Sequence, residues 1–303
     1  MTTDRHCEGR VAIVTGAGQG LGAAHARRLA RAGAMVVVND LGVLLDGGQD
    51  ADKPAVRLVE EIRADGGEAV LSAHDVSRWD QAGELVRTAI EAFGRLDILV
   101  NNAGVLRDRS LARLTEAEWD AVIAVHLKGT AATMHHAAEH WRSLASDDEH
   151  PLDARIINTT SVAGLFGNPG QTNYAAAKAG IVAMTLVAAL ELSQHGVTAN
   201  CISPGAATRM TASIPGRDAQ AMSVDDTFSP RWPAAIVEWL ASPMSAGVTG
   251  RVFMTSGRSL GIAQGWERGP STAPVEDVAD VDTALRGLLA EARSNSAMRG
   301  GTW

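Results

Sequence analysis

Short apolar runs alternate with amphipathic stretches from residue 10 to about residue 255. Strands that alternate with helices in this way form a mostly parallel sheet covered by helices, so the pattern strongly limits the possible folds. We expect strands at 10–15, 34–39, 69–73, 96–100, 155–160, 198–202 and 251–255. We expect helices at 21–32, 52–65, 79–93, 116–145, 172–194 and 231–241. The sequence therefore predicts one Rossmann-like, doubly wound α/β domain with a seven-stranded parallel sheet.

The end of the chain departs from this rhythm. Residues 257–303 are rich in glycine and proline, apart from a helix-like stretch at 282–293. We predict a sheet domain over 1–256 and a C-terminal extension over 257–303. The extension either covers a subunit interface or the active site, or forms a partly mobile tail.

Composition excludes several classes of protein. The chain has 303 residues, 46% of them apolar, which suffices for one large α/β domain. Its formal net charge is −8 without a dense Lys/Arg cluster, so nucleic acid is not an expected partner. We find no apolar run of about eighteen residues and no signal region, so neither a membrane span nor export is expected. Cys7 and Cys201 cannot form a disulfide framework, which fits a cytoplasmic protein. We predict no metal site.

A glycine-rich segment, Thr-Gly-Ala-Gly-Gln-Gly-Leu-Gly over 15–22, joins the first expected strand to the first expected helix. Glycines at such a turn let the backbone approach a pyrophosphate, whose charge is favoured by the helix N-terminus. The segment alone is weak support, because other tight strand-to-helix turns resemble it. The residues that we expect to contact a dinucleotide here are Gly16, Gln19, Gly20, Leu21 and Gly22.

Asp40 ends the second expected strand, twenty residues after Gly20. A carboxylate at this position can accept both hydroxyls of the adenosine ribose and would repel a 2′-phosphate. Gln19 stands where a basic residue would grip that phosphate, and Leu41 follows the aspartate. These choices favour NAD over NADP. The alternative for Asp40 is a turn-forming residue at a strand end.

Two further strand ends carry candidate cofactor residues. Asp75 and Val76 close the third strand, where an aspartate can accept from the adenine amino group or can simply form a turn. Asn-Asn-Ala-Gly over 101–104 closes the fourth strand, at the carboxyl edge where ligands collect in such sheets. We expect its asparagines to brace the loop, and Asn102, Ala103 and Gly104 to contact the cofactor.

Tyr174 and Lys178 stand four residues apart, and Ser161 lies thirteen residues upstream of Tyr174. Four-residue spacing places the phenol and the ammonium on one face of a helix. Opposite charges at ~4 Å in an effective dielectric of ~20 attract by about 4 kcal/mol, which would lower the pKa of Tyr174 by roughly 3 from ~10. A tyrosine tuned in this way exchanges a proton with a substrate alcohol. The pattern therefore predicts a hydride-transfer enzyme.

These motifs together, over about residues 9–255, resemble the short-chain dehydrogenase/reductase family. The resemblance implies that Ser161 holds the substrate oxygen, that Tyr174 exchanges its proton, and that Lys178 holds the nicotinamide ribose. It also implies that the cofactor contacts Pro204, Gly205 and Ala207, which follow the sixth expected strand.

One branch of the family is more similar, namely the (3R)-hydroxyacyl-CoA dehydrogenase part of peroxisomal-type multifunctional enzymes. The shared segments include Val-Val-Asn-Asp-Leu-Gly at 37–42, Val-His-Leu-Lys-Gly at 125–129 and Gly-Asn-Pro-Gly-Gln-Thr-Asn-Tyr at 167–174. The hydratase and sterol-carrier domains of those enzymes have no counterpart here. The resemblance implies a stand-alone bacterial dehydrogenase of lipid or sterol side-chain catabolism that acts on an acyl-CoA.

His126 is a departure from the family that this chain resembles. Most members of the broader family have an asparagine at this position, and the resemblance implies that this asparagine supports a proton relay to the lysine. Three interpretations stay open. The backbone carbonyl of His126 can preserve the relay, its imidazole can join the relay, or the side chain can be a packed helical histidine without a proton role.

The substrate is less constrained than the reaction. The candidates for binding the CoA phosphates are Arg107, Arg109 and Arg113, which can equally be solvated surface residues. The expected lid over the active site is residues 206–229. Its apolar residues Met210, Ile214 and Met222 either line the acyl site or serve ordinary helix packing. A 3-oxoacyl thioester reductase, a steroid alcohol dehydrogenase and a catalytically silent NAD-binding protein are the alternatives. Small residues after Tyr174, together with the family habit, predict a homodimer or homotetramer.

Overall fold

A computed structural model describes residues 5–42, 52–145, 152–205, 226–297 and 302. The chain divides into two compact units, Met1–Ala263 and Gln264–Trp303, which we describe separately. The boundary falls after residue 263, because the chain adds one more strand to the sheet beyond residue 256.

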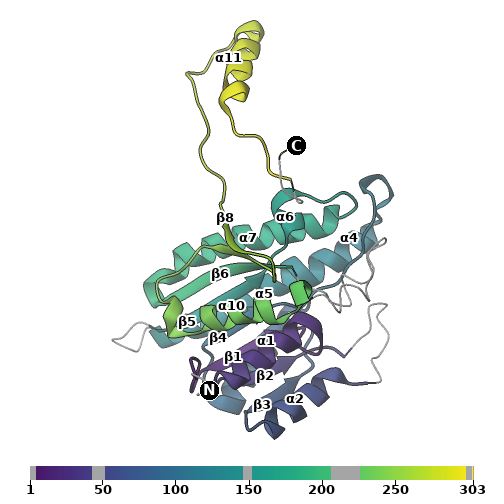
Figure 1. Ribbon diagram of the computed structural model, residues 1–303, viewed down its shortest axis with the longest axis vertical. Helices are drawn as coiled ribbons and strands as arrows, with labels where there is room; N and C mark the ends of the chain where they lie inside the picture. The colour runs from purple at the N-terminus through teal and green to yellow at the C-terminus, as the bar shows by residue number, and fades with distance from the viewer. Residues whose placement is uncertain (1–4, 43–51, 146–151, 206–225, 298–301, 303) are drawn as a thin grey trace. The chain divides into compact units, whose positions relative to one another are not determined.

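The first unit contains an eight-stranded sheet with the order β3-β2-β1-β4-β5-β6-β7-β8 (Figure 1). Its strands are β1 (Val11–Thr15), β2 (Met35–Asn39), β3 (Ala69–Ser72), β4 (Ile98–Asn101), β5 (Ala154–Thr159), β6 (Val197–Pro204), β7 (Val252–Thr255) and β8 (Leu260–Ala263). Strands β1 to β7 are parallel and correspond to the seven expected strands. Strand β8, which pairs antiparallel with β7, was missed because Leu-Gly-Ile-Ala is short and lies in a glycine-rich segment.

Helices connect the strands at close to the expected positions. The α-helices are α1 (Gly20–Arg31), α2 (Pro54–Ala64), α3 (Trp79–Phe93), α4 (Glu116–Val122), α5 (Gly129–Ala145), α6 (Val162–Phe166), α7 (Thr172–Leu192), α10 (Arg231–Ala241) and α11 (Val278–Glu291). Short 3-10 turns lie at Leu111–Arg113, Ser193–His195, Asp226–Phe228 and Pro243–Ser245. The single helix expected over 116–145 is interrupted by a π-helical segment, Ile123–Lys128, which contains His126. Such segments occur mostly at functional sites.

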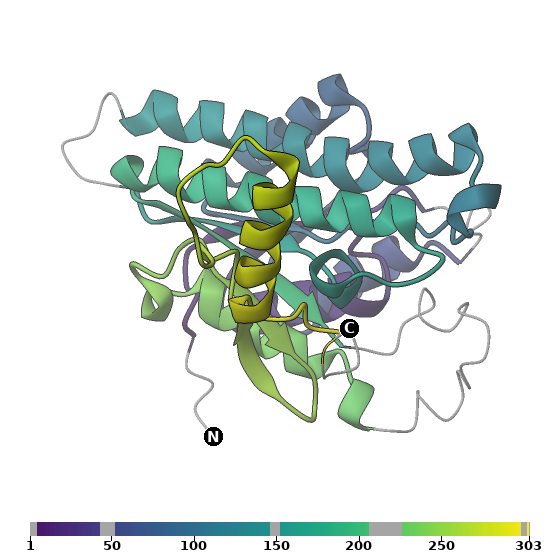
Figure 2. The same ribbon diagram turned by 90° about the horizontal axis from the view of Figure 1, so that it is seen from above.

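The central strands β1, β4 and β5 are buried on both faces, so their residues contribute to two cores. In β1, Ala12 and Val14 pack with α1, α2 and α10, whereas Val11 and Ile13 pack with α3, α5 and α7. This division follows from the two-residue period of a strand. Figure 2 shows helices α5 and α7 on one side of the sheet and α10 on the other. The near-continuous apolar runs of the sequence are thus explained.

The strand order reverses between β1 and β4, which pair with each other although two strands separate them in sequence. In doubly wound sheets ligands bind outside the carboxyl ends of the strands at this switch point. The glycine-rich segment follows β1 and Asn102 follows β4, so both lie at this edge.

Helix α7 is the one candidate membrane span among the described residues. Its segment Thr172–His195 is long and apolar enough to cross a membrane by length and composition, with a mean hydropathy of 1.7 in the best window. One such helix is weak support for a membrane span, because the core helix of a globular domain also has this length and composition. The helix buries Ile181, Ala188 and Leu192 within the protein core and carries Lys178, as the core helix of a doubly wound domain does.

The second unit contains helix α11, which begins four residues before the helix-like stretch that the sequence indicates. Asp277 caps it by accepting a hydrogen bond from the Ala279 backbone N–H at 2.8 Å. Arg286 and Asp282 form an ion pair along the helix, and Arg293 pairs with Glu267. An N-cap of this kind fixes where a helix starts more sharply than apolar spacing does.

Candidate active site

The glycine-rich turn is held from the inside by the end of β4. The Thr15 hydroxyl oxygen accepts hydrogen bonds from the backbone N–H groups of Asn102 and Ala103, both at 3.0 Å. The Asn102 side-chain amide donates to the carbonyl oxygens of Thr15 and Gly16 at 3.0 and 3.1 Å. The expectation that an asparagine braces this loop is confirmed, whereas the part played by Thr15 was not foreseen.

Gly16 shows why this turn requires glycine. Its φ is +60°, and a Cβ built there would lie 2.8 Å from the Ala103 Cα. Only glycine adopts this backbone conformation at little cost while the neighbouring chain approaches so closely. Helix α1 starts directly after this turn, at Gly20, with Gln19 as its N-cap. A pyrophosphate fits such a cradle.

Asp40 lies beside the same loop and is half-buried. One carboxylate oxygen accepts from the Gly18 N–H at 2.8 Å and the other from the Gly42 N–H at 2.8 Å. Part of its role is therefore structural, as the turn-forming alternative proposed. Each oxygen keeps further lone pairs, so the carboxylate can also accept a ribose hydroxyl.

The proposed proton-transfer residues come together from two helices, α6 and α7. Ser161 caps the short helix α6, and its hydroxyl accepts from the Ala163 N–H at 3.2 Å and also bonds to the Tyr174 side chain. Tyr174 and Lys178 are both on α7, with the Lys178 Nζ 5.6 Å from the centroid of the Tyr174 ring. The buried Lys178 ammonium donates to the Thr159 carbonyl at the end of β5, at 2.6 Å.

The charge states of this pair differ from the sequence-based expectation. Burial raises the pKa of Tyr174 to about 12, and the Ser161 hydrogen bond opposes this rise. Burial lowers the pKa of Lys178 to about 7. The expected lowering of the tyrosine pKa by the ammonium was wrong, because both groups are withdrawn from water and the lysine directs its charge at the Thr159 carbonyl.

His126 is fully buried against Tyr174, with the two rings edge-to-face at a centroid distance of 5.2 Å. Its Nε2 contacts the backbone of Val105, 3.0 Å from N and 2.8 Å from O, while Nδ1 has no partner. A Cβ on Gly104 would lie 2.2 Å from the His126 ring. Burial, followed by the charge of Lys178, lowers the pKa of His126 well below its usual value, so this imidazole is neutral.

The other expected cofactor residues occupy the same sheet edge or its flank. Asp75 accepts from the Ser77 N–H and hydroxyl at 2.9 and 2.7 Å, which is the turn-forming arrangement, and Val76 is buried. Pro204 ends β6, and Gly205 donates to the Thr255 carbonyl at 2.7 Å. Ala207 lies outside the described residues, as do Met210, Ile214 and Met222 of the expected lid.

Two of the three arginines proposed for the CoA phosphates have protein partners. Arg109 forms an ion pair with Glu118 with nitrogen–oxygen distances of 2.6 and 3.0 Å, and Arg107 donates to the Leu106 carbonyl at 2.8 Å. The Arg113 side chain is exposed. The structure thus favours the surface interpretation for Arg109.

A buried polar network behind the site escaped sequence reasoning. Asn101 donates to Asn158 at 2.9 Å, and Asn158 donates to Thr185 on α7 at 2.8 Å. Thr133 on α5 donates to Asn101 at 2.7 Å. The network fixes β4, β5 and two helices in register, and its only sequence signal was polar residues inside apolar strands.

The chain matches known proteins over most of its length. The family model described as short chain dehydrogenase matches residues 10–218. Hydroxyacyl-CoA dehydrogenase ChsB1 of Mycobacterium tuberculosis is 47% identical over 259 residues, which are 84% of this chain and 79% of that protein. Peroxisomal multifunctional enzyme type 2 of Mus musculus is 38% identical over 269 residues, which are 88% of this chain but 34% of that protein.

A solved structure shows the same fold. The crystal structure of a short chain dehydrogenase from Mycobacterium avium has a TM-score of 0.85 and 46% identity, covering 96% of this chain and 98% of that one. The resemblance inferred from the motifs is confirmed, and nicotinamide-dependent chemistry on CH–OH groups is common to such dehydrogenases. The chain is an oxidoreductase that belongs to the short-chain dehydrogenase family.

Proposed function

We propose that the chain oxidises the hydroxyl of a (3R)-3-hydroxyacyl-CoA to the 3-oxoacyl-CoA with NAD, in lipid or sterol side-chain catabolism. The observation that carries the proposal is the joint placement of Ser161, Tyr174 and Lys178 in a chain 47% identical to a hydroxyacyl-CoA dehydrogenase. The stereochemistry rests on resemblance to the multifunctional enzymes.

The residues divide the reaction between them. Ser161 orients the substrate oxygen, and Tyr174 acts in its phenolate form, so that its oxygen takes the hydroxyl proton as the C–H bond breaks. Lys178 is held by Thr159 at one end of the tyrosine ring, where it stabilises developing negative charge. NAD, when bound, supplies the acceptor for the hydride. The protein contributes orientation and an environment that excludes water.

Asp40 supports NAD as the cofactor. Its carboxylate is held at the glycine-rich turn by the hydrogen bond that it accepts from the Gly18 N–H. An adenosine ribose with a free 2′-hydroxyl fits beside a carboxylate at this position, whereas a 2′-phosphate is repelled by its charge. Leu41 is 43% exposed and adds no positive charge beside it. The same argument disfavours the alternative of an NADPH-dependent thioester reductase.

For His126 we propose a packing role, the third of the three interpretations. The neutral ring is wedged between Gly104 and Tyr174, and its Nε2 is engaged with the Val105 backbone. We expect His126→Asn to change kcat by no more than about tenfold and to leave the pH–rate profile in place. A shifted or lost ionisation in that profile would instead assign a proton-relay role to the imidazole.

We further propose a cytoplasmic homodimer or homotetramer. Helix α7 exposes Leu186, Val187 and Leu190, the last at 81%, on the helix that carries the site. An apolar helix face of this kind is covered in stable assemblies. Sedimentation equilibrium of the wild type against Leu190→Glu tests this, since a wild-type monomer would contradict it.

NADH formation at 340 nm tests the function directly. Short, medium and steroid-side-chain (3R)-hydroxyacyl-CoAs are compared with the (3S) epimers, free steroids and simple secondary alcohols, each with NAD and with NADP. NAD-specific turnover of the (3R) thioesters supports the proposal. Activity confined to free alcohols or steroids would retain the mechanism and reject the CoA substrate. Tight NAD binding without any turnover would favour a catalytically silent protein.

A further inference from the structure

Two histidines and a glutamate converge on the surface of α5, outside the candidate active site. His135 Nε2 lies 3.1 Å and His136 Nδ1 lies 3.3 Å from the same Glu139 carboxylate oxygen. The three ligand atoms are all within 4.8 Å of one another. His135 and Glu139 are exposed and His136 is half-buried, so solvent reaches the cluster.

The hydrogen bonding of His136 fixes which of its nitrogens can bind a cation. Its Nε2 lies 3.0 Å from the Trp79 carbonyl oxygen, which accepts only, so Nε2 carries a proton. In the neutral ring the lone pair is then on Nδ1, which faces the Glu139 oxygen at 3.3 Å. Two acceptors face each other, and this arrangement requires either a second proton on the ring or a cation between them.

The distances suit zinc. Zinc binds histidine nitrogen and carboxylate oxygen at about 2.0–2.2 Å in a tetrahedron, so neighbouring ligand atoms stand roughly 3.3–3.5 Å apart. The two histidine-to-glutamate distances, 3.1 and 3.3 Å, are close to this value. The third edge, between His135 Nε2 and His136 Nδ1, is no longer than 4.8 Å. A backbone carbonyl behind a metal-binding histidine, as Trp79 provides for His136, is the usual way such a ring is oriented.

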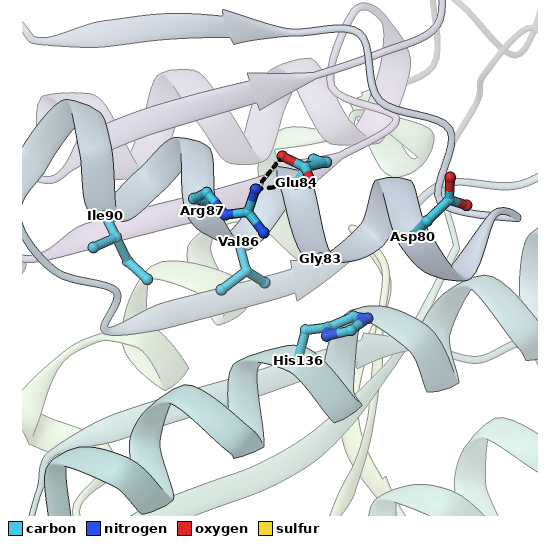
Figure 3. Close-up of a pocket in the computed structure, with 7 residues that line it drawn as sticks. All are labelled: Asp80, Gly83, Glu84, Val86, Arg87, Ile90 and His136. Carbon is cyan, nitrogen blue, oxygen red and sulfur yellow. Dashed lines mark hydrogen bonds and ion pairs between the residues drawn. The ribbon is translucent and has the colours of Figure 1, made fainter.

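A hollow in the surface lies beside one of the two histidines. A surface pocket of about 420 Å³ runs along α3 beside His136 (Figure 3). Of its charged residues, Glu84 pairs with Arg87 at 2.8 Å and Asp80 pairs with Arg78 at 3.3 Å. A Cβ on Gly83 would lie 3.2 Å from the His136 ring, so the glycine makes room for the imidazole.

We propose that His135, His136 and Glu139 form a surface Zn²⁺ site with three protein ligands and a fourth position for water. The site is separate from the dehydrogenase chemistry and does not depend on the proposed function. Its neighbour Trp79 packs its ring 5.0 Å from His135 and 5.8 Å from His136, so the histidines already have a restricted orientation.

Calorimetric titration of ZnCl₂ into the full chain, freed of any tag and of metal, tests the proposal. We expect one Zn²⁺ per chain, with affinity weakened at least about tenfold in His135→Ala, His136→Ala and Glu139→Gln. His195→Ala is the matched control, because that histidine lies at the end of α7 and outside the cluster. Circular dichroism of the metal-free variants verifies that each is folded.

Two results would overturn the proposal. One is a wild type that binds no Zn²⁺, which would leave the cluster as histidine–glutamate ion pairs. The other is Zn²⁺ binding that His135→Ala and His136→Ala retain at wild-type affinity. The buried Cys7 and Cys201 are shielded from the titrant, so thiols do not confuse either result.

Discussion

The dinucleotide end and the proton-transfer end of the site are built from different materials. At the dinucleotide end the site is formed mainly by backbone groups. Gly16 lets the chain approach the end of β4, and Gly18 lets it approach Asp40. At the second, the side chains of Tyr174 and Lys178 are withdrawn from water, and burial sets their pKa values at about 12 and about 7. One end depends on shape and the other on electrostatics.

The difference teaches where sequence patterns are sufficient. A steric requirement for glycine depends on local backbone and can be recognised from a few letters. A pKa depends on every group that surrounds the residue, and the helix spacing of Tyr174 and Lys178 contains none of that information. Substitutions at the two ends should therefore fail in different ways.

The largest effect is expected at the phenol. Tyr174→Phe removes the proton acceptor and keeps the ring that packs against His126. We expect turnover to fall by about 10³-fold or more, because general acid–base groups contribute 10²–10⁴-fold. Initial rates of NADH formation measure it. Near-normal rates would show that another group carries the proton.

The next effect concerns stability as a function of pH. The folded state lowers the pKa of Lys178 from 10.5 to about 7, so the unfolded chain binds more protons between these values and stability rises with pH there. From pH 7 to 9 the wild type should gain up to about 3 kcal/mol relative to Lys178→Met. Urea unfolding at each pH measures this.

Lys128→Met is the control for this pH series, because Lys128, at the end of the π-helical segment, is exposed to solvent. Its stability should follow the wild-type pH dependence. The net rise of wild-type stability ends near pH 9, because the pKa values of Cys7 and Cys201 are raised from 9.0 to about 11 and that of Tyr174 from 10.0 to about 12, and each makes stability fall over its interval. Equal pH dependence in both lysine variants would contradict the burial argument.

A smaller effect is expected from glycine substitution. Gly16→Ala combines a positive φ with a contact of 2.8 Å to Ala103, so we expect a loss of about 2–3 kcal/mol and weaker NAD binding. Gly42→Ala has a similar φ of +65° without a neighbour within 4 Å and should cost only about 1 kcal/mol. Chemical denaturation measures the free energy of unfolding of both variants and so separates the cost of backbone strain from the cost of the close contact with Ala103. Equal losses of stability in the two variants would show that the close contact contributes nothing.

The smallest effect concerns cofactor choice. Asp40→Asn keeps an oxygen for the Gly18 N–H and removes the charge. The ratio of kcat/KM for NAD to that for NADP should fall roughly tenfold, about 1.4 kcal/mol. An unchanged ratio would mean that Asp40 serves the turn alone.

The sequence patterns predicted the parallel strands and the long helices, and the structure brings the predicted Ser161, Tyr174 and Lys178 together. It missed the π-helical segment at Ile123–Lys128 and the strand β8, because both depend on tertiary packing and leave no periodic signal. It also missed the hydroxyl of Thr15 and the buried amides of Asn101 and Asn158, whose partners lie on strands distant in sequence.

The most direct test compares one variant at the dinucleotide end of the site with one variant at the proton-transfer end. NAD affinity by calorimetry and NADH formation are determined for Tyr174→Phe and Asp40→Ala in parallel. The account predicts that Tyr174→Phe binds NAD within about twofold of the wild type while turnover is lost, and that Asp40→Ala loses affinity at least about tenfold. Equal loss of NAD affinity in both variants, or retained turnover in Tyr174→Phe, would contradict it.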